Sequence, residues 1–147
     1  MKTIVGNLIT LAQQGQFDVI VHGCNCMCGM GAGIAKSIKE AFPEAYEADL
    51  KTIAGDRTKL GTCSFAKVGN LSVINAYTQY DWQGDGVLAD YNAIRSCFRW
   101  VKTNFSGQRI GIPMIGAGLA GGDWRVISQI IDEELAGEDL TLVVLPS

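Results

Sequence analysis

Residues 20–36 read I-V-H-G-C-N-C-M-C-G-M-G-A-G-I-A-K, and the rest of this 147-residue chain is arranged around them. The stretch starts as an apolar strand, continues as a glycine-rich loop and enters a helix. A helix that begins at such a loop leaves backbone N–H groups unpaired at the positive end of its dipole. This pattern predicts an anion site for a phosphate or diphosphate.

The composition indicates one globular domain spanning residues 1–147. Hydrophobic residues make up 48% of the chain, charged residues 18%, and the formal net charge is −3. The acidic balance argues against nucleic-acid binding through bulk electrostatics. No apolar run approaches the roughly 20 residues of a membrane span, and the amino end has no signal-peptide pattern. We therefore expect a cytoplasmic monomer with no membrane partner.

Cysteine usage predicts neither disulfides nor a metal site. The cysteines are Cys24, Cys26, Cys28, Cys63 and Cys97. An odd number in a chain with an ample apolar core favours reduced thiols. Residues 22–28 alternate as H-x-C-x-C-x-C, but alternate residues of a strand point in parallel, whereas tetrahedral zinc needs converging ligands.

Hydrophobic patterning predicts a three-layer α/β/α domain with a mixed, mostly parallel six-stranded sheet. The predicted strands are residues 2–5, 17–24, 61–68, 71–77, 109–115 and 140–145. The predicted helices are residues 8–14, 33–42, 43–55 and 88–105, and a last helix that opens at Asp123. In the third of these helices, Tyr46, Leu50 and Ile53 are expected to be buried.

A second glycine-rich loop, residues 116–122, also follows a predicted strand and precedes a helix. If the two strands are neighbours, the loops face each other and can hold a diphosphate with backbone N–H groups. Neither loop fits the lysine-bearing phosphate loop, and the first lacks the dinucleotide-binding glycine pattern.

The chain resembles the macro domain family, whose members bind ADP-ribose. The resemblance covers nearly the whole chain and rests on three segments in order: V-G-N-L-I (5–9), V-H-G-C-N-C with G-M-G-A-G-I-A (21–35), and I-P-M-I-G-A-G-L-A-G-G-D-W (112–124). Within the family it is most similar to the ADP-ribose-1″-phosphate phosphatase branch and to the neighbouring terminal ADP-ribose glycohydrolases. The latter include the antitoxin that removes ADP-ribose from DNA.

The resemblance assigns roles to individual residues. Asn7, followed by Leu8, stands where the family usually has an aspartate that accepts a hydrogen bond from the adenine amino group. Asn25 matches an asparagine that contacts the distal ribose, although a turn residue leaving a strand is the alternative. The residues that match the two diphosphate loops are Gly31, Ala32, Gly33 and Ile34, and Gly116, Ala117, Gly118 and Leu119.

His22 is the only histidine. A single histidine at the end of a buried strand is often structural. In the phosphatase branch, however, a histidine here belongs to the motif, so the resemblance implies that His22 and Asn25 are catalytic. If His22 reaches the distal ribose, it can position water or transfer a proton near neutral pH.

Two departures from the glycohydrolase pattern bear on mechanism. Gln79 stands near the place of that branch's lysine, and Ala120 at the place of its acid. A glutamine cannot form a Schiff base, which argues against a lysine-type covalent mechanism. For Asp123 a helix N-cap is favoured over catalysis.

The segment 79–87 is expected to be an exposed loop. Three carboxylates lie in this loop or just after it: Asp81, Asp85 and Asp90. Because loop carboxylates are usually solvated, they are weak candidates for groups that approach the distal ribose. Tyr80 and Trp82 form a lid over the ligand or pack the loop onto the domain.

The sequence thus predicts an ADP-ribose-binding protein that hydrolyses the phosphomonoester of ADP-ribose-1″-phosphate without a cofactor. One alternative is a module that binds ADP-ribose without turnover. The other is a hydrolase that removes ADP-ribose from modified protein or nucleic acid.

Overall fold

In the part of the chain that the computed structural model describes, residues 1–84 and 86–147, six strands form one sheet. The strands are β1 (Lys2–Val5), β2 (Val19–Cys24), β3 (Cys63–Val68), β4 (Leu71–Tyr77), β5 (Arg109–Ile112) and β6 (Asp139–Val144). Their order is β1-β6-β5-β2-β4-β3, with every neighbouring pair parallel except the β3–β4 hairpin. The predicted mixed sheet is confirmed.

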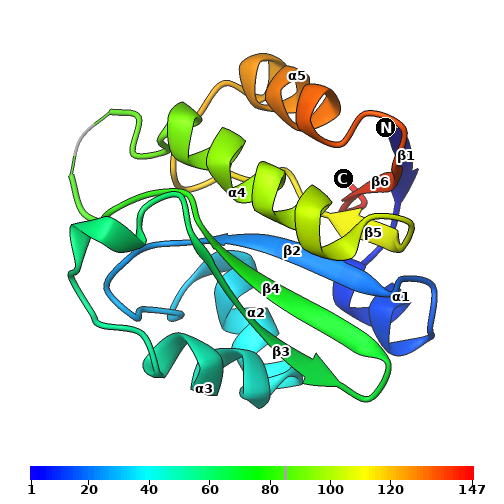
Figure 1. Cartoon of the computed structure of the whole chain (residues 1–147), viewed down its shortest axis with the longest axis horizontal. Coiled ribbons are helices and arrows are strands. Elements are labelled where there is room, and N and C mark those ends of the chain that lie inside the picture. Colours follow the sequence, from blue (N-terminus) through cyan, green and yellow to red (C-terminus); the bar gives the residue numbers. More distant parts are fainter. Residues whose placement is uncertain (85) are drawn as a thin grey trace.

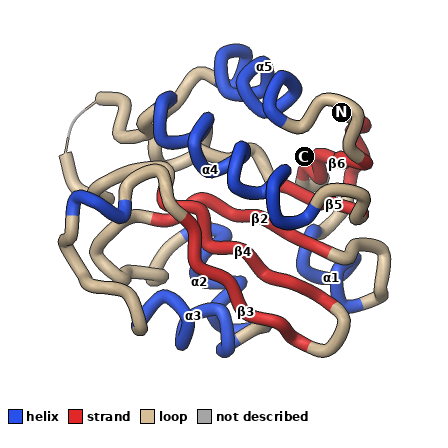
Figure 2. Tube along the Cα trace, in the orientation of Figure 1, coloured by secondary structure: helices blue, strands red, loops and turns tan. Residues whose placement is uncertain are grey.

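Helices cover both faces of the sheet, as Figures 1 and 2 show, which confirms the three-layer arrangement. The helices are α1 (Leu8–Gln13), α2 (Gly33–Ala41), α3 (Pro43–Leu50), α4 (Tyr91–Phe105), α5 (Trp124–Glu134) and the short 3-10 helix η1 (Arg57–Lys59). Helices α4 and α5 pack on one face, and α1, α2 and α3 on the other. No described helix is both long and apolar enough to cross a membrane.

Strand β2 is buried on both faces because each layer of helices takes alternate side chains. Val19 and Val21 belong to the core under α4 and α5. Ile20 belongs to the core under α1, α2 and α3. His22 follows Ile20 by two residues, so its side chain lies on the α1–α3 face.

The third predicted helix is shorter than expected. Helix α3 ends at Leu50 rather than near Gly55, and Leu50 and Ile53 are 52% and 71% exposed. Ala45 and Asp49 are its buried residues, because they face the sheet. The predicted burial of Leu50 and Ile53 was therefore wrong.

Helix α4 begins at Tyr91 rather than at Leu88. The carboxylate of Asp90 accepts a hydrogen bond from the backbone N–H of Ala93 and caps the helix. Leu88 is not part of the helix, because its backbone N–H donates to the carbonyl of Ala120.

Strands β2 and β5 are adjacent and parallel, with Val19 opposite Ile110. Both strands therefore end at the same edge of the sheet. The two glycine loops follow those ends, so the condition for a shared diphosphate site is met.

Candidate functional site

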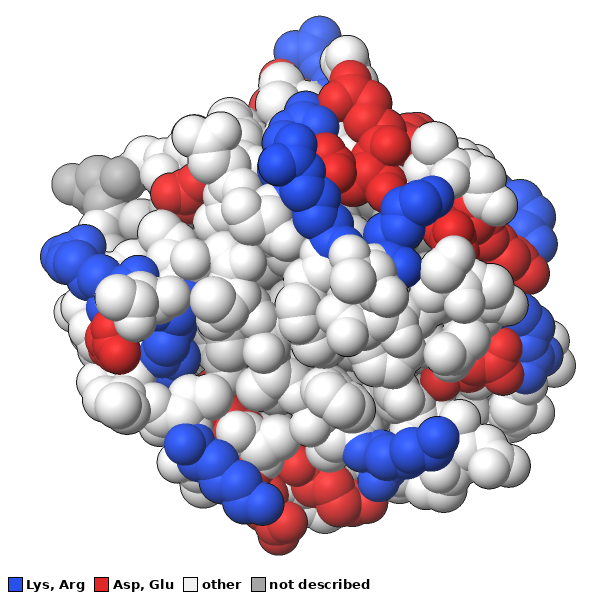
Figure 3. Space-filling model, viewed as in Figure 1, with Lys and Arg blue, Asp and Glu red and all other residues white. Residues whose placement is uncertain are grey.

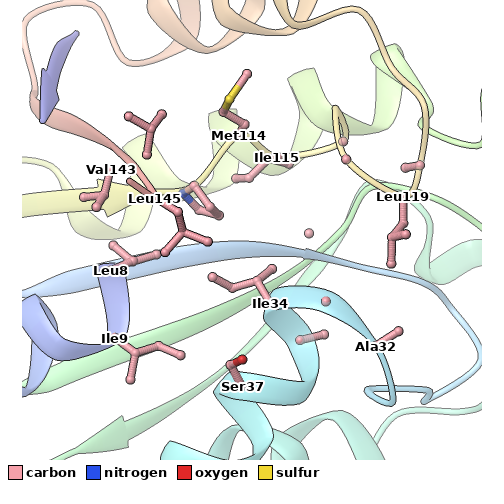
Figure 4. Close-up of a pocket in the computed structure, with 18 of the residues that line it drawn as sticks. Leu8, Ile9, Ala32, Ile34, Ser37, Met114, Ile115, Leu119, Val143 and Leu145 are labelled. Carbon is pink, nitrogen blue, oxygen red and sulfur yellow. The ribbon is translucent and has the colours of Figure 1, made fainter. Parts of the chain in front are cut away.

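A cleft of about 600 Å³ lies between the two glycine loops, at the carboxyl edge of the sheet. Figure 4 shows Leu8, Val143 and Leu145 grouped toward one end, and Ala32 and Leu119 at the other. This volume falls in the range of small-molecule sites, and the carboxyl edge is where open α/β sheets bind ligands.

The described lining of the cleft carries no ionisable side chain. Its hydrogen-bonding side chains are those of Asn7, Ser37 and Gln79. A ligand is therefore held by apolar contacts, by neutral polar groups and by the backbone.

Backbone N–H groups on both loops are available to a ligand. Among the described residues, those of residues 31–35 and of Gly116, Gly118, Leu119 and Ala120 have no acceptor. Residues 33–35 lie in the first turn of α2, where a helix leaves such donors unpaired. Together these donors suit the oxygens of a diphosphate.

Glycine is required at particular points of this framework. Gly33 has φ +59°, a backbone conformation that favours glycine, and a side chain there would contact Leu119 of the opposite loop. At Gly122 a β-carbon would lie 2.6 Å from the carbonyl of Gly116, which accepts a hydrogen bond from the N–H of Gly122. The second loop therefore closes on itself only with glycine at 122.

Most of the predicted ligand-binding residues line this one cleft. They are Asn7, Leu8, Ala32, Gly33, Ile34, Gly116, Gly118 and Leu119. Gly31 and Ala117 lie in the same loops without lining the cleft. Contact of each residue with a ligand stays a prediction.

Asn25 organises the first loop from within. Its Oδ1 accepts hydrogen bonds from the backbone N–H groups of Met27 and Gly29, at 2.9 and 3.3 Å. Its Nδ2 donates to the carbonyl of Gly29 at 2.9 Å. These are the bonds of a turn residue, so the structure supports the alternative that the sequence left open for Asn25.

His22 is buried away from the cleft. Its side chain is 1% exposed and is not part of the cleft lining. The distance between Nε2 of His22 and Oδ1 of Asn75 on β4 is 2.7 Å. Burial lowers the pKa of His22 to about 4, and the bond to Asn75 offsets only part of that effect. The imidazole is thus neutral near pH 7 and does not face the space in which a ligand fits.

The segment after β4 reaches the site through Gln79. Gln79 lines the cleft, and its Nε2 donates to the carbonyl of Asp81 at 2.9 Å. Tyr80 donates from its hydroxyl to the carbonyl of Gly55, which packs this segment onto the domain. Trp82 is 53% exposed and its ring lies against Gly29.

The predicted loop carboxylates are engaged elsewhere. Asp81 accepts hydrogen bonds from the N–H groups of the two residues that follow it. Asp90 caps α4, and Asp123 caps α5 while pairing with Arg125, as the N-cap interpretation of Asp123 predicts. Asp85 lies outside the described residues.

A buried polar cluster under the first loop was missed by sequence reasoning. Lys59, 7% exposed, donates from Nζ to the carbonyl of Cys26 at 3.1 Å. The hydroxyl of Tyr77 donates to Asp49 at 2.7 Å, and burial raises the pKa of Asp49. The sequence gives no signal for this cluster, because a buried aspartate or lysine looks the same there as a solvated one.

Comparison with known proteins agrees with this geometry. The family model described as Macro domain matches residues 21–131. The chain belongs to the macro domain family. It is similar to an uncharacterised 17.5 kDa protein of Enterobacteria phage T4, with 34% identity over 97% of this chain and 95% of that protein.

Two further proteins that the chain is similar to carry functional names. A DNA ADP-ribosyl glycohydrolase of Thermus aquaticus is 24% identical over 92% of this chain, an alignment that spans 38% of the Thermus protein. The structure of Thermosipho africanus DarTG in complex with ADP-ribose superposes with a TM-score of 0.74 and 18% identity, over 99% of this chain and 42% of that one. The latter likeness concerns the fold.

Proposed function

We propose that this macro domain binds ADP-ribose, or a larger molecule that carries ADP-ribose, in the cleft between the two glycine loops. The observation that carries the proposal is the set of backbone N–H groups without a protein acceptor on both loops, whose residues, except Gly31, line one uncharged cleft. The diphosphate lies across these donors. The base occupies the end formed by Leu8, Val143 and Leu145, where apolar side chains pack on its faces.

Binding without turnover is the form of this function that the geometry favours. General acid–base hydrolysis uses a side chain that activates water or protonates the leaving oxygen, and the described lining holds no ionisable side chain. Gln79 stands near the place of the glycohydrolase lysine and Ala120 at the place of its acid, and both line the cleft.

Hydrolysis of ADP-ribose-1″-phosphate is the second candidate. In that reaction water attacks the terminal phosphorus and the phosphomonoester bond breaks. The products are inorganic phosphate and ADP-ribose. Its support is the H-x-C-N-C pattern that leads into the first loop. In this candidate His22 and Asn25 are positioning residues, because one is buried against Asn75 and the other holds the turn.

One set of assays separates these candidates. Calorimetry measures ADP-ribose binding to the purified chain, and we expect a single site with micromolar affinity. The chain is then incubated separately with ADP-ribose-1″-phosphate and with ADP-ribosylated DNA and protein, and released phosphate or ADP-ribose is quantified. Gly118→Val, which adds a side chain at a residue that lines the cleft, is the control.

Binding with every substrate recovered intact supports the recognition function. Phosphate release by the wild-type chain and not by Gly118→Val establishes the phosphatase instead. Release of ADP-ribose from DNA or protein establishes a hydrolase of those conjugates. Absence of binding at millimolar ADP-ribose contradicts the proposal as a whole.

A further inference from the structure

Cys28 and Lys59 form a thiol–ammonium pair beneath the first glycine loop. Nζ of Lys59 lies 3.6 Å from Sγ of Cys28 and donates to the carbonyl of Cys26 at 3.1 Å. Lys59 is 7% exposed, and no carboxylate among the described residues lies within ion-pair distance of it. An ammonium has three N–H donors, so one N–H of this buried group has no acceptor in the described part of the chain. The pair therefore places a buried positive charge and a free N–H donor beside one sulfur atom.

Cys28 differs from the other four cysteines. Burial raises the pKa of the Cys24 and Cys26 thiols. The contact with Cys63, together with burial, raises the pKa of Cys97. Cys63 is partly exposed, as Cys28 is, but its sulfur lies 3.9 Å from the carbonyl of Cys97 and has no hydrogen-bond contact with a described lysine or arginine. Cys28 therefore combines partial exposure with an ammonium neighbour.

The Cys28 side chain connects the first glycine loop to the end of α3. Its thiol donates to the carbonyl of Asp49 at 3.2 Å and lies 3.5 Å from the hydroxyl oxygen of Thr52. The backbone of Cys28 has φ +57°, a conformation that is uncommon for a residue other than glycine. The same loop continues into residues 31–35, whose backbone N–H groups have no protein acceptor. A change at this sulfur therefore acts on the loop that supplies donors to the proposed ligand.

We propose that Cys28 is a site of reversible oxidation by a peroxide, and that this oxidation weakens ligand binding in the cleft. The effect on binding rests on the proposed ADP-ribose site. In the reaction the sulfur attacks one peroxide oxygen, so that an S–O bond forms and the O–O bond breaks. The sulfur is oxidised to a sulfenic acid and the peroxide is reduced. The second oxygen leaves as hydroxide and takes up the thiol proton to give water.

The groups around the sulfur favour this reaction and explain its consequence. The Lys59 ammonium stabilises negative charge on the sulfur as it attacks. Its free N–H then donates to the oxygen of the sulfenic acid. The S–H donor to the carbonyl of Asp49 is lost once the sulfur carries an oxygen. The loop is then held to α3 by one hydrogen bond fewer.

Labelling of the full chain tests the oxidation site without any ligand. The chain is exposed to hydrogen peroxide with dimedone, which traps sulfenic acids, and each cysteine peptide is quantified by mass spectrometry. We expect Cys28 to be labelled at least about 10-fold faster than Cys63. Lys59→Met keeps most of the side-chain volume without the charge and should slow the labelling of Cys28 about 10-fold, whereas Lys59→Arg should restore part of the rate. Thermal unfolding shows whether each variant is folded, and the comparison of Cys28 with Cys63 needs no variant.

Calorimetry before and after peroxide treatment tests the effect on the cleft. ADP-ribose should bind the oxidised wild-type chain about 3- to 10-fold more weakly than the reduced chain, the loss expected for one hydrogen bond. A thiol reductant should restore the affinity, because a sulfenic acid is reversible. In Cys28→Ser, peroxide should leave the affinity of that variant unchanged, because a hydroxyl is not oxidised.

Each outcome decides one part of the proposal. Labelling of Cys63 as fast as that of Cys28 overturns the oxidation site, and an unchanged rate in folded Lys59→Met overturns the role of Lys59. Labelling of Cys28 with unchanged ADP-ribose affinity overturns its effect on the cleft, as does an equal loss of affinity in peroxide-treated Cys28→Ser. Absence of ADP-ribose binding by the reduced wild-type chain overturns the proposed function and the effect on the cleft, while the labelling result decides the oxidation site by itself.

Discussion

His22 donates a hydrogen bond of 2.7 Å from Nε2 to Oδ1 of Asn75, and Asn75 in turn donates from Nδ2 to the carbonyl of Ala45. The second bond fixes the amide, so its oxygen must face the histidine and Nε2 must carry the proton. The pair links β2, β4 and α3 just behind the first glycine loop. The histidine that the sequence placed among the catalytic residues is part of this framework.

The stability of the protein is expected to fall as the pH drops from about 6.5 to about 4. Burial lowers the pKa of His22 from 6.5 to about 4. Between these two pH values His22 is therefore protonated in the unfolded chain and neutral in the folded chain. His22 therefore contributes stability above pH 6.5 and loses it on acidification, by up to about 3 kcal/mol. Urea unfolding at a series of pH values measures the change.

His22→Gln is the control for that series, because glutamine keeps an N–H donor for Asn75 and does not titrate. Its unfolding free energy is expected to depend less steeply on pH than that of the wild type between pH 6.5 and 4. Parallel curves for the two proteins would contradict the assignment of a buried neutral imidazole.

Gly118→Val is expected to weaken ADP-ribose binding without affecting folding. A β-carbon at Gly118 meets nothing within 4 Å, and Gly118 lines the cleft, so the added side chain enters the space of the diphosphate. The unfolding free energy should change by less than about 0.5 kcal/mol. ADP-ribose affinity should fall at least about 10-fold, which one unfavourable contact of roughly 1.4 kcal/mol produces.

Gly137→Val should show the reverse pattern. Gly137 has φ +83° and lies outside the cleft lining, so a branched side chain strains the backbone by about 1–2 kcal/mol. Its affinity for ADP-ribose should equal that of the wild type. If the two variants lose stability and affinity together, the cleft is not the binding site.

The affinity for ADP-ribose is expected to respond weakly to salt. No charged side chain lines the described cleft, so no ion pair with the diphosphate is screened when salt is added. The chain carries a net charge of −3, so added salt also weakens long-range repulsion of the anionic ligand. Between about 0.05 M and about 0.5 M NaCl the dissociation constant should change less than about 3-fold. A weakening beyond about 10-fold would show that a basic side chain holds the ligand.

Gly23→Ala is expected to destabilise the fold through Thr78. A β-carbon at Gly23 would lie 2.7 Å from the hydroxyl oxygen of Thr78 and 3.2 Å from Ile115. Overpacking of this kind costs about 1–3 kcal/mol. In a Thr78→Ala background the cost should be smaller by about 1 kcal/mol, because half of the clash is gone. If the losses of unfolding free energy caused by Gly23→Ala and Thr78→Ala simply add in thermal or urea unfolding, the contact between residues 23 and 78 is contradicted.

Much of the fold could be predicted because apolar runs and glycines mark it locally. Strands β1 and β4 have the predicted bounds, Lys2–Val5 and Leu71–Tyr77. The two glycine loops were recognised as partners because each follows a strand and opens a helix. The two loops are adjacent because β2 pairs with β5, and no local sequence pattern predicts that pairing.

The roles of polar residues were harder to predict because they depend on which face a helix covers. His22 shares its face with Ile20, and only the position of α3 above Asn75 shows that this face is closed. Asn75 is one of two small polar residues in the mainly apolar β4, with Ser72, and the strand sequence does not show what it bonds. Lys59 gave no signal, since a buried lysine and a solvated one look alike in sequence.

A structure of this chain with ADP-ribose tests the central claim most directly. We expect diphosphate oxygens within hydrogen-bond distance of backbone N–H groups in residues 31–35, 116 and 118–120, with the base beside Asn7 and His22 still bonded to Asn75. A ligand bound elsewhere on the surface, or held by lysine or arginine side chains outside the cleft, would contradict the account.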